Sequence, residues 1–153
     1  SGQQLLVWRR RPVQGRLAGM ETYAVVCAAG TLRAQDNAGA VHFPHRWTDG
    51  GVEVSAAFTG AHLLHTAVAG CVLNDLYREA SALGLVLAGV RVTAWGGFDE
   101  AWASKGIEYR VELDAALDPP TLADLLRHVD EVAEIPRAVR TGARVARVPS
   151  RDQ

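Results

Sequence analysis

The sequence contains few of the residues on which several classes of protein depend. Its two cysteines, Cys27 and Cys71, are too few for a disulfide scaffold and, by themselves, for a structural zinc site. No apolar run approaches the roughly 20 residues that span a bilayer, and the N-terminus lacks the apolar core of a secretory signal. We therefore expect a protein of a reducing compartment, the cytoplasm, that does not enter a membrane.

An excess of charge of one sign is also missing. Sixteen basic and 17 acidic residues give a formal net charge of -1, so no protein-wide field attracts nucleic acid. Four arginines without an acidic residue lie in residues 1–19, ahead of Met20. We interpret this stretch as an accessory basic segment, with a functional basic patch or an extra strand as alternatives. With 48% apolar residues, residues 20–153 are expected to form a single domain.

The order of predicted elements defines an α+β protein. Leucine, valine and alanine recur at helical spacing between Thr59, a suitable N-cap, and Gly84, a suitable stop. A second helix is expected over 118–135, with Pro136 interrupting it and a short helix following over 136–142. Runs rich in β-branched residues predict antiparallel strands over 22–28, 31–36, 40–47, 85–99, 105–115 and 143–148.

Two motifs in this pattern resemble those of a known family. The stretch "TGAHLLHTAVAGC", which ends at Cys71 and follows Pro44, Gly50 and Gly51, resembles the helix motif of the OsmC/Ohr family of hydroperoxide-detoxifying proteins. The later "AEIPRAVRTGARV" is similar to the closing motif of that family. The resemblance, which covers residues 22–149, implies an OsmC-like fold with a long central cysteine-bearing helix in an intertwined homodimer.

The resemblance also implies a chemistry. In the family, the thiolate of the helix cysteine attacks an organic hydroperoxide and becomes a sulfenic acid, while an arginine stabilises the thiolate. A thiolate is the nucleophilic form of cysteine, and a neighbouring cation lowers the pKa of the thiol. The match assigns the nucleophile to Cys71 and the stabilising arginine to Arg33 in "GTLRAQD".

Two expected family residues are absent. Ile135 stands where the second cysteine is expected, and Ala61 stands where a glutamate holds the arginine. We therefore expect a one-cysteine peroxidase cycle with an external thiol reductant and no cofactor, in which His62 or Cys27 serves as an auxiliary residue. The alternative is an inactive OsmC-like protein that binds a small apolar molecule. The helical face of Cys71 fits either, because it carries apolar residues at one end and, at the other, Asn74, Asp75 and Arg78.

The histidines raise a further alternative. His42 and His45 form one pair, and His62 and His65 form another at a spacing of three residues, which can place two imidazoles on one metal ion. No carboxylate or thiol has a recognised metal-motif spacing to them, so the sequence favours no metal and leaves the four-histidine site as an alternative. Cys27, for its part, is also explained as a small buried hydrophobe.

Overall fold

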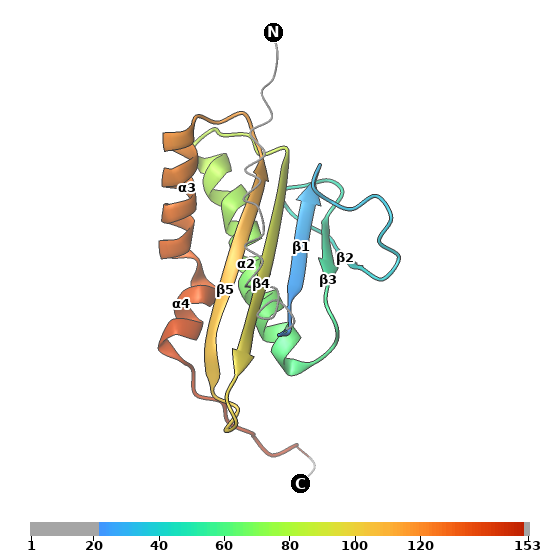
Figure 1. Ribbon diagram of the computed structural model, residues 1–153, viewed down its shortest axis with the longest axis vertical. Helices are drawn as coiled ribbons and strands as arrows, with labels where there is room; N and C mark the ends of the chain where they lie inside the picture. Colours follow the sequence, from blue (N-terminus) through green and yellow to red (C-terminus); the bar gives the residue numbers. More distant parts are fainter. Residues whose placement is uncertain (1–21, 152–153) are drawn as a thin grey trace.

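The computed structural model describes residues 22–151, which fold into an antiparallel sheet backed by helices (Figure 1). The sheet has five strands in the order β2-β3-β1-β4-β5. The strands are β1 (Val25–Gly30), β2 (Val41–Phe43), β3 (Val52–Ser55), β4 (Gly89–Phe98) and β5 (Ser104–Asp114). The basic segment 1–19 lies outside the described residues, so its interpretation stays a prediction.

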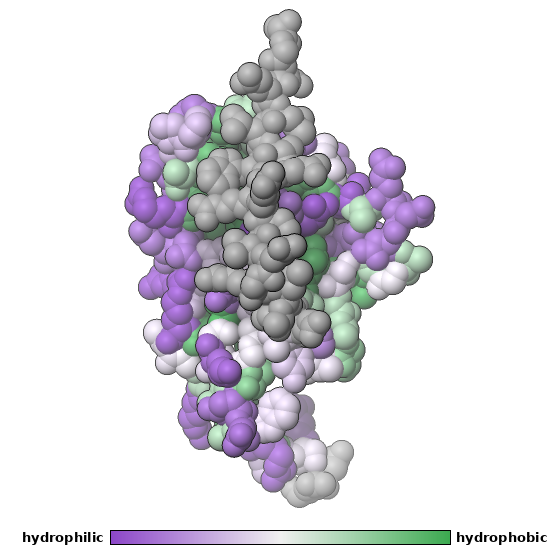
Figure 2. Space-filling view, viewed as in Figure 1, coloured by the Kyte–Doolittle hydropathy of each residue, from purple (hydrophilic) through white to green (hydrophobic). Residues whose placement is uncertain are grey.

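Three helices accompany the sheet in the described part of the chain: α2 (Gly60–Ala82), α3 (Pro119–Val132) and α4 (Glu134–Thr141). Helix α2 packs against β1 and β4, and both α3 and α4 pack against α2. The outer side of α3, at the left of the view, is largely hydrophilic (Figure 2). None of these helices is long and apolar enough to cross a membrane. The predicted α+β class is confirmed.

The core lies between α2 and the sheet. Val25 and Cys27 of β1 point to the same side of the sheet and are fully buried, as are Leu73 and Leu76 of α2. Burying an aliphatic side chain of this size contributes about 1.5–3 kcal/mol. These contacts fix the rotation of α2 about its own axis and thereby decide that Cys71 remains partly accessible.

The strands between β1 and α2 differ from the prediction. Residues 31–36 form a turn instead of a strand, because Gly30 adopts a left-handed φ of 62° that ends β1. The strand predicted over 40–47 is limited to β2, since Pro44 has no N–H for continued pairing. The third strand of this region is β3, which the sequence pattern missed.

The C-terminal part also departs from the prediction. A helix break occurs as predicted, but α4 begins at Glu134, two residues before Pro136, because proline is tolerated in the first turn of a helix. No strand forms over 143–148, and Val145 is 93% exposed. The alternation of arginine and valine there fits the strand pattern. A strand also needs a neighbouring edge, and none of the described strands pairs with this segment.

Candidate functional site

The sulfur of Cys71 lies where α2 meets the beginning of α4. The backbone N–H of Ile135 donates to this sulfur at 3.5 Å. The thiol in turn lies 3.6 Å from Oε2 of Glu134 and 3.7 Å from Oδ2 of Asp75, within hydrogen-bonding distance for sulfur. Asp75 follows Cys71 by one helical turn, which places both side chains on one face of α2. The site therefore joins one thiol, one backbone donor and two carboxylates.

Arg78 holds these carboxylates together. Its guanidinium lies 3.2 Å from Asp75, 2.9 Å from Glu134 and 3.3 Å from Glu79. Nε2 of His128 in α3 lies 3.1 Å from Glu79, so the polar network connects all three described helices. Exposed ion pairs contribute little on their own, but the Asp75 side chain is only 1% exposed and needs its partners.

The thiol is protonated at neutral pH in this arrangement. The pKa of Cys71 is raised to about 11, mainly by burial; the Ile135 N–H opposes the rise, and the negative charges of Asp75 and Glu134 add to it. Burial and the neighbouring Glu134 also raise the pKa of Asp75. The pKa of Glu134 falls to about 2, mainly through its hydrogen bond with Asp75 and also through Arg78. Glu134 is therefore ionised beside the thiol at neutral pH.

Arg33 lies in the turn after β1, where backbone carbonyls hold its guanidinium. The side chain donates to the carbonyl of Gly30 at 3.4 Å and to that of Gly50 at 2.8 Å. A methyl group on Gly50 would lie 2.4 Å from this guanidinium, so the glycine leaves the space that Arg33 occupies. Arg33 supplies none of the hydrogen bonds of Cys71. The single chain does not bring the two together, and a stabilising role for Arg33 stays a prediction.

The second cysteine occupies a different environment. Cys27 is fully buried in β1, where burial raises the pKa of its thiol to about 12. Both cysteines are free thiols. A resolving thiol has to reach an accessible sulfenic acid, so the position of Cys27 favours its interpretation as a packing residue, and its auxiliary role stays a prediction.

His62 and His65 lie at the beginning of α2. Nδ1 of His62 is 2.6 Å from Oγ1 of Thr59, the residue that caps the helix, and the His62 ring packs edge-on against Tyr23. His65 is fully buried, and its Nδ1 bonds the carbonyl of Tyr23 at 2.8 Å. The geometry gives both rings structural contacts, and an auxiliary catalytic role for His62 stays a prediction.

The four histidines do not converge on one point. His42 is exposed on β2, whereas His45 lies in the following loop and bonds Thr48 and Asn74. Over residues 22–151, the group of three side chains that could share an ion contains no histidine. Its members, whose ligand atoms lie within 4.8 Å of one another, are Cys71, Asp75 and Glu134. Because Arg78 already pairs with both of these carboxylates, the arrangement does not argue for a metal.

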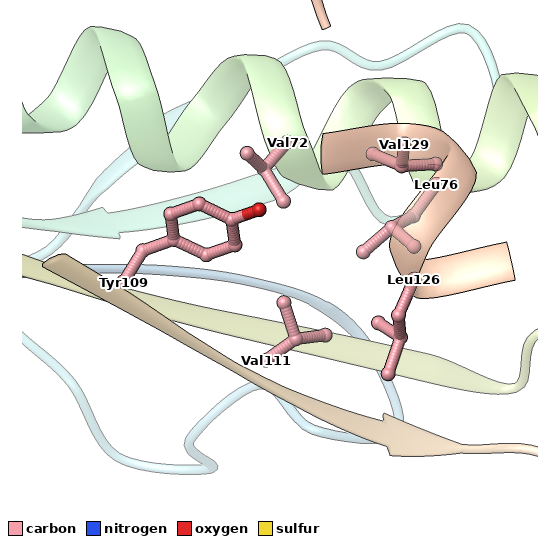
Figure 3. A pocket seen from close by; sticks show the side chains of 6 residues that line it. All are labelled: Val72, Leu76, Tyr109, Val111, Leu126 and Val129. Atoms are coloured by element: carbon pink, nitrogen blue, oxygen red, sulfur yellow. The ribbon is translucent and has the colours of Figure 1, made fainter. Parts of the chain in front are cut away.

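An apolar cavity of about 210 Å³ lies between α2, β5 and α3 (Figure 3). Its wall includes Val72, the residue after Cys71, and the ring of Tyr109, whose hydroxyl donates to Asp130. The remaining lining residues are Leu76, Val111, Leu126 and Val129. A cavity of this size and lining is suited to a small apolar group.

Glu134 is the site residue that sequence reasoning missed. The only signal was its place next to Ile135, the position at which the resemblance expects a second cysteine close to Cys71. Asp75 and Arg78 were recognised on the helical face of Cys71, although no role was assigned to them.

The fold and site define an α+β protein in which a long helix presents a partly exposed thiol. Residues 51–146 match the family model described as OsmC-like protein, and the chain belongs to this family. The match confirms the resemblance and the OsmC-like fold. A similar solved structure is an OsmC-like hydroperoxide resistance protein from Jannaschia sp. CCS1, at 12% identity and a TM-score of 0.48 over 85% of this chain and 95% of that one. Comparison with curated proteins gives no match.

Proposed function

We propose that this protein reduces organic hydroperoxides by a one-cysteine cycle in which Cys71 is the nucleophile and an external thiol is the reductant. The observation that carries the proposal is the pairing of a partly exposed sulfur with the N–H of Ile135 on one side and the carboxylate of Glu134 on the other. Membership in the OsmC-like family supports it, because the resemblance implies this activity.

The first half of the cycle has to remove the thiol proton, since Cys71 rests as a thiol. Glu134, with a pKa of about 2, is too weak a base to retain this proton, so its carboxylate holds the S–H in position while the sulfur attacks the distal oxygen of the peroxide. The O–O bond breaks, and the departing alkoxide takes that proton and leaves as an alcohol. The N–H of Ile135, at the beginning of α4, stabilises the negative charge on sulfur during the attack. The products are one alcohol and the sulfenic acid of Cys71.

The second half needs two equivalents of thiol. Because Ile135 replaces the second cysteine and Cys27 is fully buried, the chain offers no second accessible thiol to reduce the sulfenic acid of Cys71. The first external thiol attacks the sulfur of the sulfenic acid and releases water, which leaves a mixed disulfide. A second thiol attacks this disulfide, restores the thiol of Cys71 and leaves as the oxidised reductant.

A homodimer completes the proposal. Val41 and Phe43 are exposed on the edge strand β2, and Phe58, shortly before α2, is also exposed. Covering these side chains with a second copy removes apolar surface from water.

A second candidate function follows from the cavity beside Val72 and the raised pKa of Cys71. In this case the protein binds a small apolar molecule in the cavity and performs no redox chemistry. A binder of this kind would lose its ligand when a large side chain fills the cavity, as in Val111→Trp, whereas it would be indifferent to Cys71→Ser.

The two functions are separated by treating the reduced protein with cumene hydroperoxide and a dimedone-type probe, followed by mass spectrometry. The peroxidase proposal expects the adduct on Cys71 in the wild type and in Cys27→Ser, none in Cys71→Ser, and continued peroxide consumption with added thiol. An unmodified Cys71 at excess peroxide would contradict the proposal and favour the binding function.

A further inference from the structure

The charged groups around the thiol are predominantly acidic. From α2 come the carboxylates of Asp75 and Glu79, and from α4 comes that of Glu134. The cation that contacts all three is Arg78. His128 of α3 adds a positive charge only when it is protonated. Arg78 divides its single charge among these carboxylates and Asp75 is buried, so the carboxylate that faces an approaching molecule beside Cys71 is the exposed one of Glu134.

The geometry places this negative charge at the entrance of the site. The Glu134 side chain is 60% exposed, and its Oε2 lies 3.6 Å from the thiol sulfur. The guanidinium of Arg78 faces the carboxylates, and the hydrogen bonds of the sulfur go to Asp75, Glu134 and the backbone of Ile135. Among the described residues, no cation is hydrogen-bonded to the sulfur. A charged reactant is consequently attracted or repelled mainly by Glu134.

We propose that the external thiol that returns Cys71 to its reduced form is cationic or neutral, and that anionic thiols are disfavoured at this site. The proposal rests on the proposed peroxidase function, for which it names the class of the second substrate. The thiolate of the reductant forms a bond with the sulfur of Cys71, the S–O bond of the sulfenic acid breaks, and the oxygen leaves as water after taking up a proton. A second equivalent of reductant then reduces the mixed disulfide.

Cumene hydroperoxide, the oxidant of the test described below, is uncharged, so the acidic surroundings leave its approach unaffected. Charge selection therefore acts on the second half of the cycle and can be measured apart from the first. Interactions of this kind change association rates by about tenfold or more at low ionic strength and weaken as salt screens them.

The test uses the full-length protein with Cys71 converted to the sulfenic acid by cumene hydroperoxide. Its rate of reduction is measured with three thiols of similar size: cysteamine, which is cationic, 2-mercaptoethanol, which is neutral, and 3-mercaptopropionate, which is anionic. Each rate is divided by the fraction of the reagent that is thiolate at the pH of the assay. It is divided again by the rate at which the same reagent reduces a small uncharged disulfide, which corrects for the intrinsic reactivity of the reagent. We expect cysteamine to exceed 3-mercaptopropionate by about tenfold in low salt, and added salt to reduce the ratio.

Two variants assign the effect to its source. Glu134→Gln removes the exposed carboxylate and should bring the rates of the cationic and anionic thiols close together. Glu131→Gln is the matched control, because Glu131 is an exposed glutamate on α3 whose partner is Arg127. The Glu131→Gln control should retain the wild-type ratio of the cysteamine rate to the 3-mercaptopropionate rate. Equal rates for all three thiols in the wild type, or a preference for the anionic one, would overturn the proposal.

A separate measurement keeps the charge proposal distinct from the peroxidase proposal. If hydroperoxide produces no sulfenic acid, the proposed function fails, and the reduced thiol is then treated with methanethiosulfonate reagents that carry either a trimethylammonium or a sulfonate group. Faster modification by the cationic reagent, lost in Glu134→Gln, would establish the charge selection of the site. Equal modification by both reagents would overturn it.

Discussion

The carboxylate of Glu134 lies 3.6 Å from the sulfur of Cys71, although 63 positions separate the two residues in the chain. The contact exists because α3 ends at Val132 and α4 begins two residues later, which turns the first residues of α4 toward the middle of α2. The protonation and reactivity of the thiol therefore depend on where α4 begins.

The first prediction concerns the acidity of the thiol. Glu134→Gln should lower the pKa of Cys71 from about 11, because both the charge of Glu134 and its hydrogen bond favour the protonated thiol. The pH dependence of alkylation by iodoacetamide, a neutral reagent, reports this pKa. Glu131→Gln should leave the profile unchanged. An unshifted profile in Glu134→Gln would show that this carboxylate does not act on the thiol.

The second prediction concerns stability in acid. The pKa of Glu134 is lowered from its ordinary 4.5 to about 2, so its ionised form stabilises the fold above about pH 4.5 and the benefit is lost as the pH falls toward 2. The raised pKa of Asp75 acts in the opposite direction. Because Glu134 is exposed, we expect a contribution of about 1 kcal/mol or less. Urea unfolding should show a smaller loss of stability over this range for Glu134→Gln than for the wild type.

The third prediction concerns a buried hydroxyl. The hydroxyl of Tyr77 is buried without a hydrogen-bond partner among the described residues, and burial raises the pKa of Tyr77 to about 12. Tyr77→Phe removes this unsatisfied group and should increase the free energy of unfolding by about 1 kcal/mol. Tyr109→Phe is the contrasting control, since it breaks the bond to Asp130 and should destabilise the protein. Denaturant unfolding measures both, and a less stable Tyr77→Phe would contradict the assignment.

The fourth prediction concerns the oligomeric state. Light scattering after size-exclusion chromatography should give the mass of a dimer. Phe43→Asp places a charge on the exposed edge strand β2 and should shift the protein to the monomer. Val86→Asp, at an exposed position in the loop between α2 and β4, should remain dimeric. A wild-type protein that stays monomeric at high concentration would contradict the proposed homodimer.

The predictability of the fold depended on how regular each segment is. The long helix α2 and the strands β4 and β5 were predicted because their periodicity extends over ten residues or more. Strand β3 was missed because it has only four residues and buries Glu53 along with its valines, which hides the alternation. A turn replaced the strand over 31–36 because Gly30, and not the composition of those residues, determines the path of the chain there.

The site was predictable only within one element. The motif in α2 identified Cys71, and helical spacing placed Asp75 and Arg78 on its face. Glu134 could not be assigned, because its position depends on how three helices pack. Arg33 was assigned from the resemblance, but its guanidinium bonds the carbonyls of Gly30 and Gly50 and not Cys71, so its role stays a prediction.

The helix end at Gly142 has a consequence for the turnover of the protein. Beyond this glycine the described chain adds neither helix nor strand, and Arg144 and Arg147 are exposed in a segment that pairs with no described strand. A protease that cleaves after arginine would reach this segment without first unfolding the domain, and the fragment would keep the sheet and helices α2 to α4. Trimming of this tail should therefore proceed independently of the stability of the core.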